Sequence, residues 1–238
     1  LVGLKPPRDA YLVTRLREAG AVLLGKTNLS EWANFRGERS VSGWSGRGGQ
    51  TRNPYVLDRN PSGSSSGSAV AVSANLCVVA IGTETNGSII SPSTVCGVVG
   101  FKPTVGLVSR SGVIPIAATF DTAGPIARTV RDAALVLAAL AGVDERDAVT
   151  QNLPADLPRK LALPLPAGAL NGARVGVIRH PSARRDPDAG MAVGLDVLRA
   201  AGAEIIDVGE LPGPASAGTA RIDVMLYEMK AGINAYLA

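Results

Sequence analysis

The chain has 238 residues, of which 46% are hydrophobic, and this is enough for a substantial core in one large domain or two small ones. Its formal net charge of +4 comes from 24 basic and 20 acidic residues with no run of Lys or Arg longer than two, and only 4% of residues are aromatic. This composition argues against nucleic-acid binding. We therefore expect a globular protein without a nucleic-acid partner.

The beginning of the chain predicts a helix followed by a strand. Asp9 is a suitable N-cap, Gly20 is a suitable C′ residue, and the residues between them place apolar side chains on one face, namely Leu12, Val13, Leu16 and Ala19. The apolar run 21–24 then predicts a buried strand. Residues 198–206 repeat this order of helix, glycine and strand, which we interpret as a recurrent αβ pattern and not as a duplication.

Two further helices are expected in the middle of the chain. The Ala- and Val-rich residues 69–80 predict a buried helix that gives way to a strand at 77–81. Thr129 and Asp132 resemble a capping box in which Asp replaces Glu, and this predicts a helix that runs through Leu140. The apolar part of that helix is bounded by Asp132 and Asp144 and is shorter than the roughly 20 residues that a bilayer requires, so we expect no membrane partner.

The last third of the chain combines a Pro-rich stretch with another strand. Residues 152–172 contain four prolines and predict a linker or surface excursion, whereas 174–178 predict a strand. The alternation of helices and strands favours an α/β fold, with a mixed, largely parallel sheet covered by helices, and residues 1–238 are expected to form a single domain.

Residues 60–101 are unusual because they contain nine serines and six glycines but only one charged side chain, Glu84. A buried hydroxyl without a partner costs about 1 to 3 kcal/mol, so this segment predicts an internal polar network. Glycine beside serine also lets the main chain approach a ligand. Cys77 and Cys96 lie in the same segment, and we interpret both as small buried residues.

Several chemistries can be set aside from the residues alone. The motif GSSSGS at 63–68 lacks the Gly-Lys-Ser/Thr of a phosphate loop. His180 is the only histidine and follows a strand far along the chain, so neither a Ser-His-Asp triad nor a two-histidine zinc site is supported. We expect no metal and no cofactor. A serine nucleophile whose proton passes through a second hydroxyl to a lysine remains, because burial lowers the pKa of a lysine toward neutrality.

Three motifs then carry a resemblance to a known family. The segments GSSSGS at 63–68, GTETNGSI at 82–89 and CGVVGFKPT at 96–104 closely resemble the core of the amidase signature family, and GKTNLSEW at 25–32 and DTAGP at 121–125 fit it as well. Within the family the chain is most similar to peptide amidases, judging from SGWSGRGGQTRNPY at 42–55.

The resemblance implies roles for individual residues. It makes Ser88 the nucleophile and Ser64 the bridging serine, which is held by a cis peptide bond. The main-chain amides of Thr85, Asn86 and Gly87, together with that of Ser88, would form the oxyanion hole. Many relatives carry arginine two places after the nucleophile, where this chain has Ile90, and Asn86 stands where relatives usually have Asp or Gly. Ser65 would support the site.

The resemblance does not supply the catalytic lysine. In the family this lysine lies in a Lys-Asp-Asn-like segment farther upstream than this chain extends, and no such segment occurs here. Lys26 belongs to the separate GKTN motif, and we interpret it as a structural or supporting residue; Lys5 and Lys102 match no better. We therefore expect that the chain is truncated at its N-terminus and also at its C-terminus.

The function expected from this resemblance is hydrolysis of a carboxamide, such as a C-terminal peptide amide, to carboxylate and ammonia through an acyl-enzyme. The partner would be a small-molecule or peptide amide, and we expect a cytoplasmic protein. Two alternatives stay open: a glutaminase-like amidotransferase subunit, which would pass ammonia to a partner, and a noncatalytic fragment on an amidase scaffold.

Overall fold

The structure is a computed structural model that describes residues 5–178, 189–209 and 217–237. The chain divides into two compact units. The first combines Leu1–Leu163 with Asp223–Ala238, and the second is formed by Pro164–Ile222. His180 lies outside the described residues.

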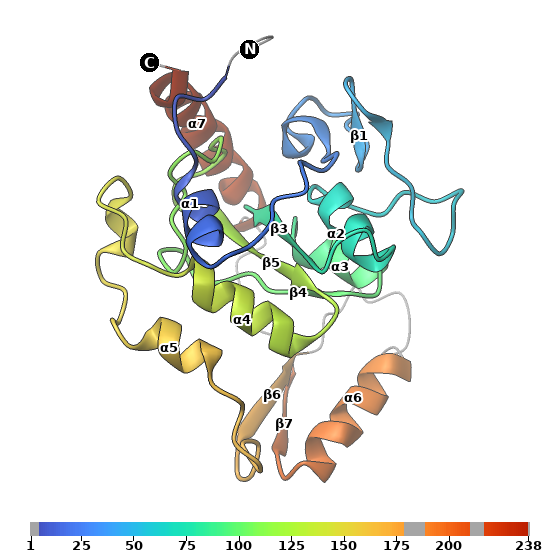
Figure 1. Cartoon of the computed structure of the whole chain (residues 1–238). Coiled ribbons are helices and arrows are strands. Elements are labelled where there is room, and N and C mark those ends of the chain that lie inside the picture. Colours follow the sequence, from blue (N-terminus) through green and yellow to red (C-terminus); the bar gives the residue numbers. More distant parts are fainter. Residues whose placement is uncertain (1–4, 179–188, 210–216, 238) are drawn as a thin grey trace. The chain divides into compact units, whose positions relative to one another are not determined.

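The first unit is built around a three-stranded sheet with the order β3-β5-β4. Strand β5 (Thr122–Ala127) lies between β3 (Val79–Glu84) and β4 (Val99–Gly100) and is antiparallel to both. All six residues of β5 are buried, as expected for the central strand of a covered sheet. Figure 1 shows this sheet at the centre of the unit.

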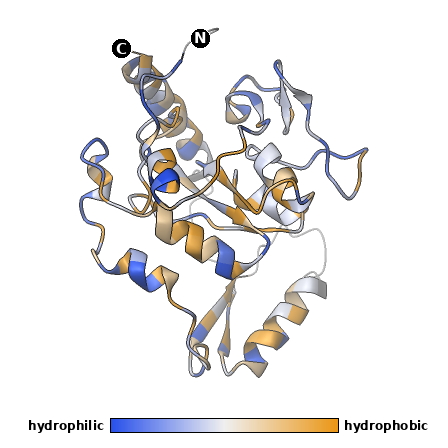
Figure 2. Ribbon diagram, in the orientation of Figure 1, coloured by the Kyte–Doolittle hydropathy of each residue, from blue (hydrophilic) through white to orange (hydrophobic). Residues whose placement is uncertain are grey.

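Helices cover both faces of this sheet. Ala123 of β5 packs in a cluster with residues of α1 (Tyr11–Glu18) and α4 (Val130–Leu140). Ile126, three positions along the strand and thus on its other face, packs with residues of α2 (Ser66–Ser73) and with Ile89 beside α3 (Ile90–Val95). Figure 2 shows hydrophobic residues along the sheet and on α4. The result is three layers, with the sheet between two helical layers.

The remaining elements of the first unit are short, apart from its last helix. They are the 3-10 turns η1 (Glu31–Asn34) and η2 (Ala148–Thr150), the antiparallel strands β1 (Trp44–Ser45) and β2 (Gly49–Gln50), and helix α5 (Leu157–Ala162). Helix α7 (Ala217–Leu237) closes the chain, and its residues from Asp223 onward belong to this unit. Helix α5 lies within the stretch expected to be a linker or surface excursion, 152–172.

The second unit contains one parallel strand pair. Strand β6 (Arg174–Ile178) pairs with β7 (Glu204–Gly209), and helix α6 (Ala189–Ala200) lies between them in sequence. Gly202 joins helix to strand with φ of 93°. The helix, glycine and strand predicted for 198–206 are therefore confirmed.

The predicted α/β class is confirmed, but the expected pairing needs a correction. Parallel pairing occurs between β6 and β7, whereas both strand pairs of the central sheet are antiparallel. The sheet is therefore not largely parallel over the described part of the chain. Parallel neighbours require a crossover connection, which is usually helical, but β4 and β5 are joined by an irregular stretch of chain that contains no helix.

The helix predictions differ in their details. The Thr129 cap is confirmed, because its Oγ1 accepts a hydrogen bond of 3.0 Å from the Asp132 amide. Asp9 is not an N-cap, since Ala10 occupies that position and the Asp9 carboxylate instead accepts a hydrogen bond from Arg17 Nε at 2.8 Å. The buried helix begins at Ser66 and not at Ala69.

The predicted strand at 21–24 is wrong. These residues form no strand, and Val22 and Leu24 are 83% and 74% exposed. A strand requires a neighbour to satisfy its main-chain groups, and no strand of the described residues pairs with this segment. The expected strand at 77–81 does form, but it begins at Val79.

The two cysteines differ in burial. Both cysteines are free; Cys96 is buried as expected, whereas Cys77 is only partly buried. Burial raises the pKa of the Cys96 thiol to about 11. Across the described ranges, no helix combines the length and the apolar character needed to cross a bilayer.

Candidate active site

The loop that carries Ser88 is fixed at both ends by a buried carboxylate. Glu84 is the last residue of β3, and its Oε2 accepts hydrogen bonds from the amides of Ile89 at 2.6 Å and Ile90 at 3.0 Å. The carboxylate therefore satisfies donors at the start of α3 and closes the loop between strand and helix. Within this loop Gly87 has φ of 84°, a value that favours glycine.

A second carboxylate holds the first residue of the loop. Thr85 Oγ1 donates a hydrogen bond of 2.5 Å to Asp121 Oδ1. Asp121 Oδ2 in turn accepts from the amides of Ile116 and Ala117 at 2.8 and 2.9 Å. The loop is thus tied to the segment that leads into β5.

Ser64 lies beside the Ser88 loop. The peptide bond between Gly63 and Ser64 is cis, as the resemblance implies. The carbonyl of Ser64 accepts a hydrogen bond of 3.0 Å from the Ser30 amide, and the amide of the next residue, Ser65, donates to the carbonyl of Ser88 at 3.1 Å. These main-chain bonds bring the two serine segments together.

Neighbouring serines attach helix α2 to the central sheet. Ser65 Oγ donates to the Thr83 carbonyl and accepts from the Thr83 amide, both at 3.0 Å. Ser68 Oγ donates to the Ile81 carbonyl at 2.8 Å. Ser65 therefore supports the site by fixing the strand that leads to the Ser88 loop.

The hydroxyl of Ser64 differs from those of its neighbours. Ser64 is only 1% exposed, yet its Oγ has no hydrogen-bond partner among the described residues. Ser88 is half-buried, and no hydrogen bond of the described structure uses its hydroxyl or joins it to Ser64. Over the same residues, the amides of Asn86, Gly87 and Ser88 also donate no hydrogen bond. The unused amides of residues 86–88 and the buried Ser64 hydroxyl therefore belong to two segments that lie next to each other.

Ser64 and Ser88 line the same cavity, which has a volume of about 490 Å³. This volume suits a small ligand. Its apolar wall includes Trp32, Val113, Ile114, Ile116 and Met229. Thr85 lines the cavity as well, whereas Asn86 and Gly87 contribute no lining side chain and Asn86 is exposed.

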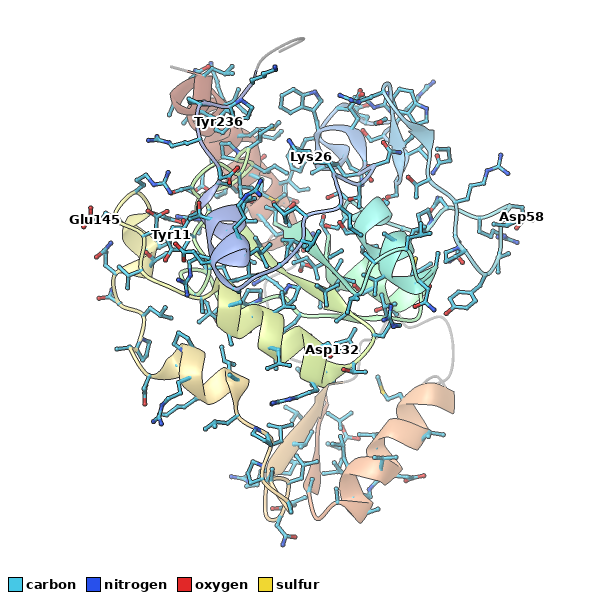
Figure 3. The ribbon with its side chains drawn as sticks, in the orientation of Figure 1. Tyr11, Lys26, Asp58, Asp132, Glu145 and Tyr236 are labelled. Atoms are coloured by element: carbon cyan, nitrogen blue, oxygen red, sulfur yellow. The ribbon has the colours of Figure 1, made fainter. Side chains whose placement is uncertain are left out.

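Lys26 lies outside this cavity. Its side chain is exposed, and its ammonium makes no hydrogen bond or ion pair with any described residue. Figure 3 labels it on the stretch of chain that follows α1. No lysine of the described chain lines the cavity. The structure thus gives Lys26 no direct contact with either serine.

Several residues of this region were not identified from the sequence. Arg110 lines the cavity, and its Nε and Nη2 donate to the two carboxylate oxygens of Asp147 at 3.0 and 2.7 Å. This hydrogen-bonded carboxylate raises the pKa of Arg110. Burial opposes ionisation of Asp147, but the hydrogen bonds from Arg110 outweigh it, so the pKa of Asp147 is lowered. Since the two residues are 37 positions apart, no local pattern reveals the pair.

Asp147 belongs to a larger group that we term the carboxylate cluster, composed of Ser109, Arg110, Asp144, Asp147 and Thr150. The Asp144 carboxylate accepts from Ser109 Oγ at 2.7 Å and from the amide of Arg146 at 3.1 Å. Although burial opposes its ionisation, these hydrogen bonds lower the pKa of Asp144 to about 2. The Thr150 hydroxyl donates to the Asp147 carbonyl at 2.8 Å.

Comparisons with known proteins identify relatives of this chain. The family model described as Amidase matches residues 1–234. The structure is similar to that of native peptide amidase from Stenotrophomonas maltophilia, with 54% sequence identity, a TM-score of 0.93, and coverage of 99% of this chain and 48% of that one.

Two curated relatives extend the comparison. A probable amidase of Arabidopsis thaliana is 45% identical over 100% of this chain and 46% of its own length. A glutamyl-tRNA(Gln) amidotransferase subunit of Synechococcus elongatus is 41% identical over 95% of this chain and 48% of its own length. The chain therefore spans about half the length of these relatives.

Proposed function

The chain belongs to the amidase family, and from this we propose that it carries the nucleophile half of an enzyme that hydrolyses carboxamides to carboxylate and ammonia. A C-terminal peptide amide is the substrate class that we favour, because the similarity to peptide amidase covers 99% of the chain. The activity is assigned to the protein that contains this chain together with a catalytic lysine.

One observation carries this proposal. The buried Ser64 hydroxyl lacks a protein partner among the described residues and lines the same cavity as Ser88. Most buried serines make a hydrogen bond, as Ser65 and Ser68 do. The buried hydroxyl of Ser93 is also unpaired, but among the described serines only that of Ser64 combines this state with a place in the cavity lining. An unsatisfied hydroxyl beside a potential nucleophile is instead consistent with a proton relay that is completed by further groups.

In the proposed reaction, Ser88 Oγ attacks the amide carbonyl carbon and forms a new C–O bond, while its proton moves to Ser64 and from there to a lysine. The unused amides of Asn86, Gly87 and Ser88, together with that of Thr85, donate hydrogen bonds to the carbonyl oxygen as it becomes negatively charged. The relay then returns a proton to the leaving nitrogen, the C–N bond breaks, and ammonia departs. Water hydrolyses the resulting acyl-enzyme by the reverse sequence.

The lysine of this relay is assigned to a segment that the present sequence does not include. The exposed position of Lys26 and the lysine-free lining of the described cavity support this assignment. For the chain as given we expect little or no turnover, because removing the base from a coupled relay lowers the rate by several orders of magnitude. Substantial activity in this chain would show that Lys26 or another residue acts as the base.

A covalent probe tests the assignment of the nucleophile. With the upstream coding sequence included, a fluorophosphonate should label Ser88, as identified by mass spectrometry of the modified peptide, and Ser88→Ala should abolish the labelling. Ser91→Ala is a matched control, because Ser91 is three positions away and does not line the cavity. Labelling of a different residue would refute the proposal.

The similarity to the amidotransferase subunit supports a second candidate. A glutaminase-like subunit would use the same serine chemistry but would pass ammonia to a partner. Stable co-purification with a larger complex, together with glutamine as the preferred substrate, would favour this function. A protein that is not labelled even with the upstream segment present would instead be a noncatalytic member of the family.

A further inference from the structure

A left-handed turn forms part of the cavity wall. Trp32, Ala33 and Asn34 have φ values of 50°, 50° and 72°. Residues with a side chain adopt this region at a cost of about 1 to 3 kcal/mol each, and neither Trp nor Ala favours it as Asn does. The surrounding contacts must therefore impose the conformation.

Hydrogen bonds tie this turn to the serine site. The Ala33 amide donates to the Ser30 carbonyl at 2.8 Å, and the Ser30 amide donates to the Ser64 carbonyl at 3.0 Å. On the other side, Glu31 Oε2 accepts from the Gly46 amide at 2.7 Å. These bonds fix the main chain of the turn relative to the proposed relay serine.

A second hollow shares part of its lining with the cavity. It has a volume of about 390 Å³ and is lined by Glu31, Trp32, Phe35, Arg36, Met229 and Ile233. Three of these residues, Glu31, Trp32 and Met229, also line the first cavity. The two spaces are therefore neighbours that share the Trp32 side chain, which is 43% exposed.

The lining of the second hollow is suited to an apolar group. Phe35, Met229 and Ile233 are each half-buried and present apolar surface. The flexible thioether of a methionine adapts to side chains of different shape. The guanidinium of Arg36 stacks over the ring of Trp44, with 4.6 Å to the ring centroid.

We propose that the second hollow is a subsite for the apolar side chain of the residue that precedes the terminal amide residue of a peptide amide. This inference rests on the proposed function, since it places the scissile carbonyl at Ser88 and the rest of the peptide past Trp32. Trp32 lines both the cavity and the second hollow. A turn whose main chain is held in place before binding lowers the ordering cost of binding, and this would explain why the strained conformation is retained.

Tryptophan fluorescence provides a direct test, because Trp32 and Trp44 are the two tryptophans of the chain. Trp44→Phe leaves Trp32 as the single reporter and keeps an aromatic ring under Arg36. Three ligands are titrated: N-acetyl-leucinamide, N-acetyl-glycyl-leucinamide and N-acetyl-phenylalanyl-leucinamide. Because burial of a large apolar side chain contributes about 1.5 kcal/mol or more, we expect the phenylalanyl ligand to bind about tenfold more tightly than the glycyl ligand.

Substitutions in the second hollow test whether it is the source of the tighter binding of the phenylalanyl ligand. Ile233→Asn, in a residue that lines only the second hollow, should remove the tenfold preference for the phenylalanyl over the glycyl ligand. Trp32→Gly should remove it as well, measured by calorimetry, and glycine is compatible with the positive φ of this position. Asn34→Gly is the matched control: it changes the same turn at a residue that lines neither hollow, and the preference should persist.

The outcomes separate this inference from the proposed function. Equal dissociation constants for the phenylalanyl and glycyl ligands would overturn the subsite, and so would a preference that survives both Ile233→Asn and Trp32→Gly. In either case, fluorophosphonate labelling of Ser88 would leave the proposed hydrolase intact. Failure of all three ligands to bind, together with absence of labelling, would overturn both.

Discussion

The first unit contains two polar regions that differ in how their groups are paired. In the carboxylate cluster, Asp144 and Asp147 accept hydrogen bonds from Ser109, Arg110 and Arg146, and the Thr150 hydroxyl is bonded as well. In the second region, which we term the serine site and which comprises Ser64, Ser88 and the amides of 86–88, the Ser64 hydroxyl and these amides have no partner among the described residues.

This difference indicates a division of roles. Paired buried groups contribute to stability, whereas a buried unpaired group such as the Ser64 hydroxyl costs free energy and is retained where it binds something else. The carboxylate cluster should therefore be sensitive in folding experiments, and the serine site in activity experiments. Substitutions in each region can test this contrast, and Arg110 links the two because it pairs with Asp147 and lines the cavity.

The largest expected effect is that of Ser88→Ala on turnover. With the upstream segment present, removal of the nucleophile should lower kcat by about four orders of magnitude or more. Because Ser88 Oγ makes no hydrogen bond in the described structure, the free energy of unfolding should change by less than about 0.5 kcal/mol. Ammonia release and urea denaturation measure the two quantities, and a variant that keeps a tenth of the activity would contradict the assignment.

Ser64→Ala should have opposite effects on the two quantities: it should lower kcat and raise the free energy of unfolding. Loss of the relay should lower kcat by about a hundredfold to a thousandfold. Loss of a buried, unsatisfied hydroxyl should raise the free energy of unfolding by about 1 kcal/mol. The same two measurements apply. A clear loss of stability would show that Ser64 has a structural hydrogen bond, and the distinction between the two regions would fail.

Asp147→Ala tests the other side of the comparison. It leaves the partly buried guanidinium of Arg110 without its carboxylate, and we expect the free energy of unfolding to fall by about 3 kcal/mol. Chemical denaturation provides the measurement. Glu145→Gln is the matched control. It removes a carboxylate of the same segment, and this carboxylate is exposed and makes no ion pair in the described structure (Figure 3). Equal stability of the two variants would count against the cluster.

The pH dependence of stability is a further test of the carboxylate cluster. Since the folded pKa of Asp144 is about 2, below the ordinary value of 3.8, the ionised group stabilises the fold above about pH 4. This contribution, about 2 kcal/mol, should disappear as the pH falls from 4 to 2. Denaturation of wild type and Asp144→Asn at pH 5, 3 and 2 would show the difference between them shrinking, whereas a constant difference would contradict it.

The smallest effect is expected for a residue outside both regions. Thr129→Ala removes the cap of α4 and should lower the free energy of unfolding by about 1 kcal/mol without changing kcat. Thr129→Ser, which keeps the hydroxyl, is the control that should restore most of the loss. If Thr129→Ala matches Asp147→Ala in cost, the carboxylate cluster contributes no more than an ordinary cap.

Local patterns predicted those parts of the fold that depend on neighbouring residues. The α4 cap needs only Thr129 and Asp132, which are three positions apart, and the sequence identified it. The motifs also identified Ser64 and Ser88, which line one cavity. Their catalytic roles stay a prediction, as does the oxyanion hole.

Features that depend on distant partners could not be predicted in this way. Residues 21–24 and 203–206 follow the same helix and glycine pattern, but only the second segment has a strand to pair with, β6. The Ser109–Asp144 hydrogen bond joins residues 35 positions apart. The left-handed turn at Trp32 has no local signal either, because tryptophan has no preference for positive φ.

The carboxylate of Glu84 has a consequence for how this region can evolve. By accepting hydrogen bonds from Ile89 and Ile90, it fastens the end of a strand to the start of a helix across only four intervening residues. An inserted or deleted residue there would separate the carboxylate from these amides and displace Ser88. The number of residues between Glu84 and Ile89 is therefore constrained. In the largely exposed stretch 152–156 no buried carboxylate joins two elements in this way, so its length can change with little loss of stability.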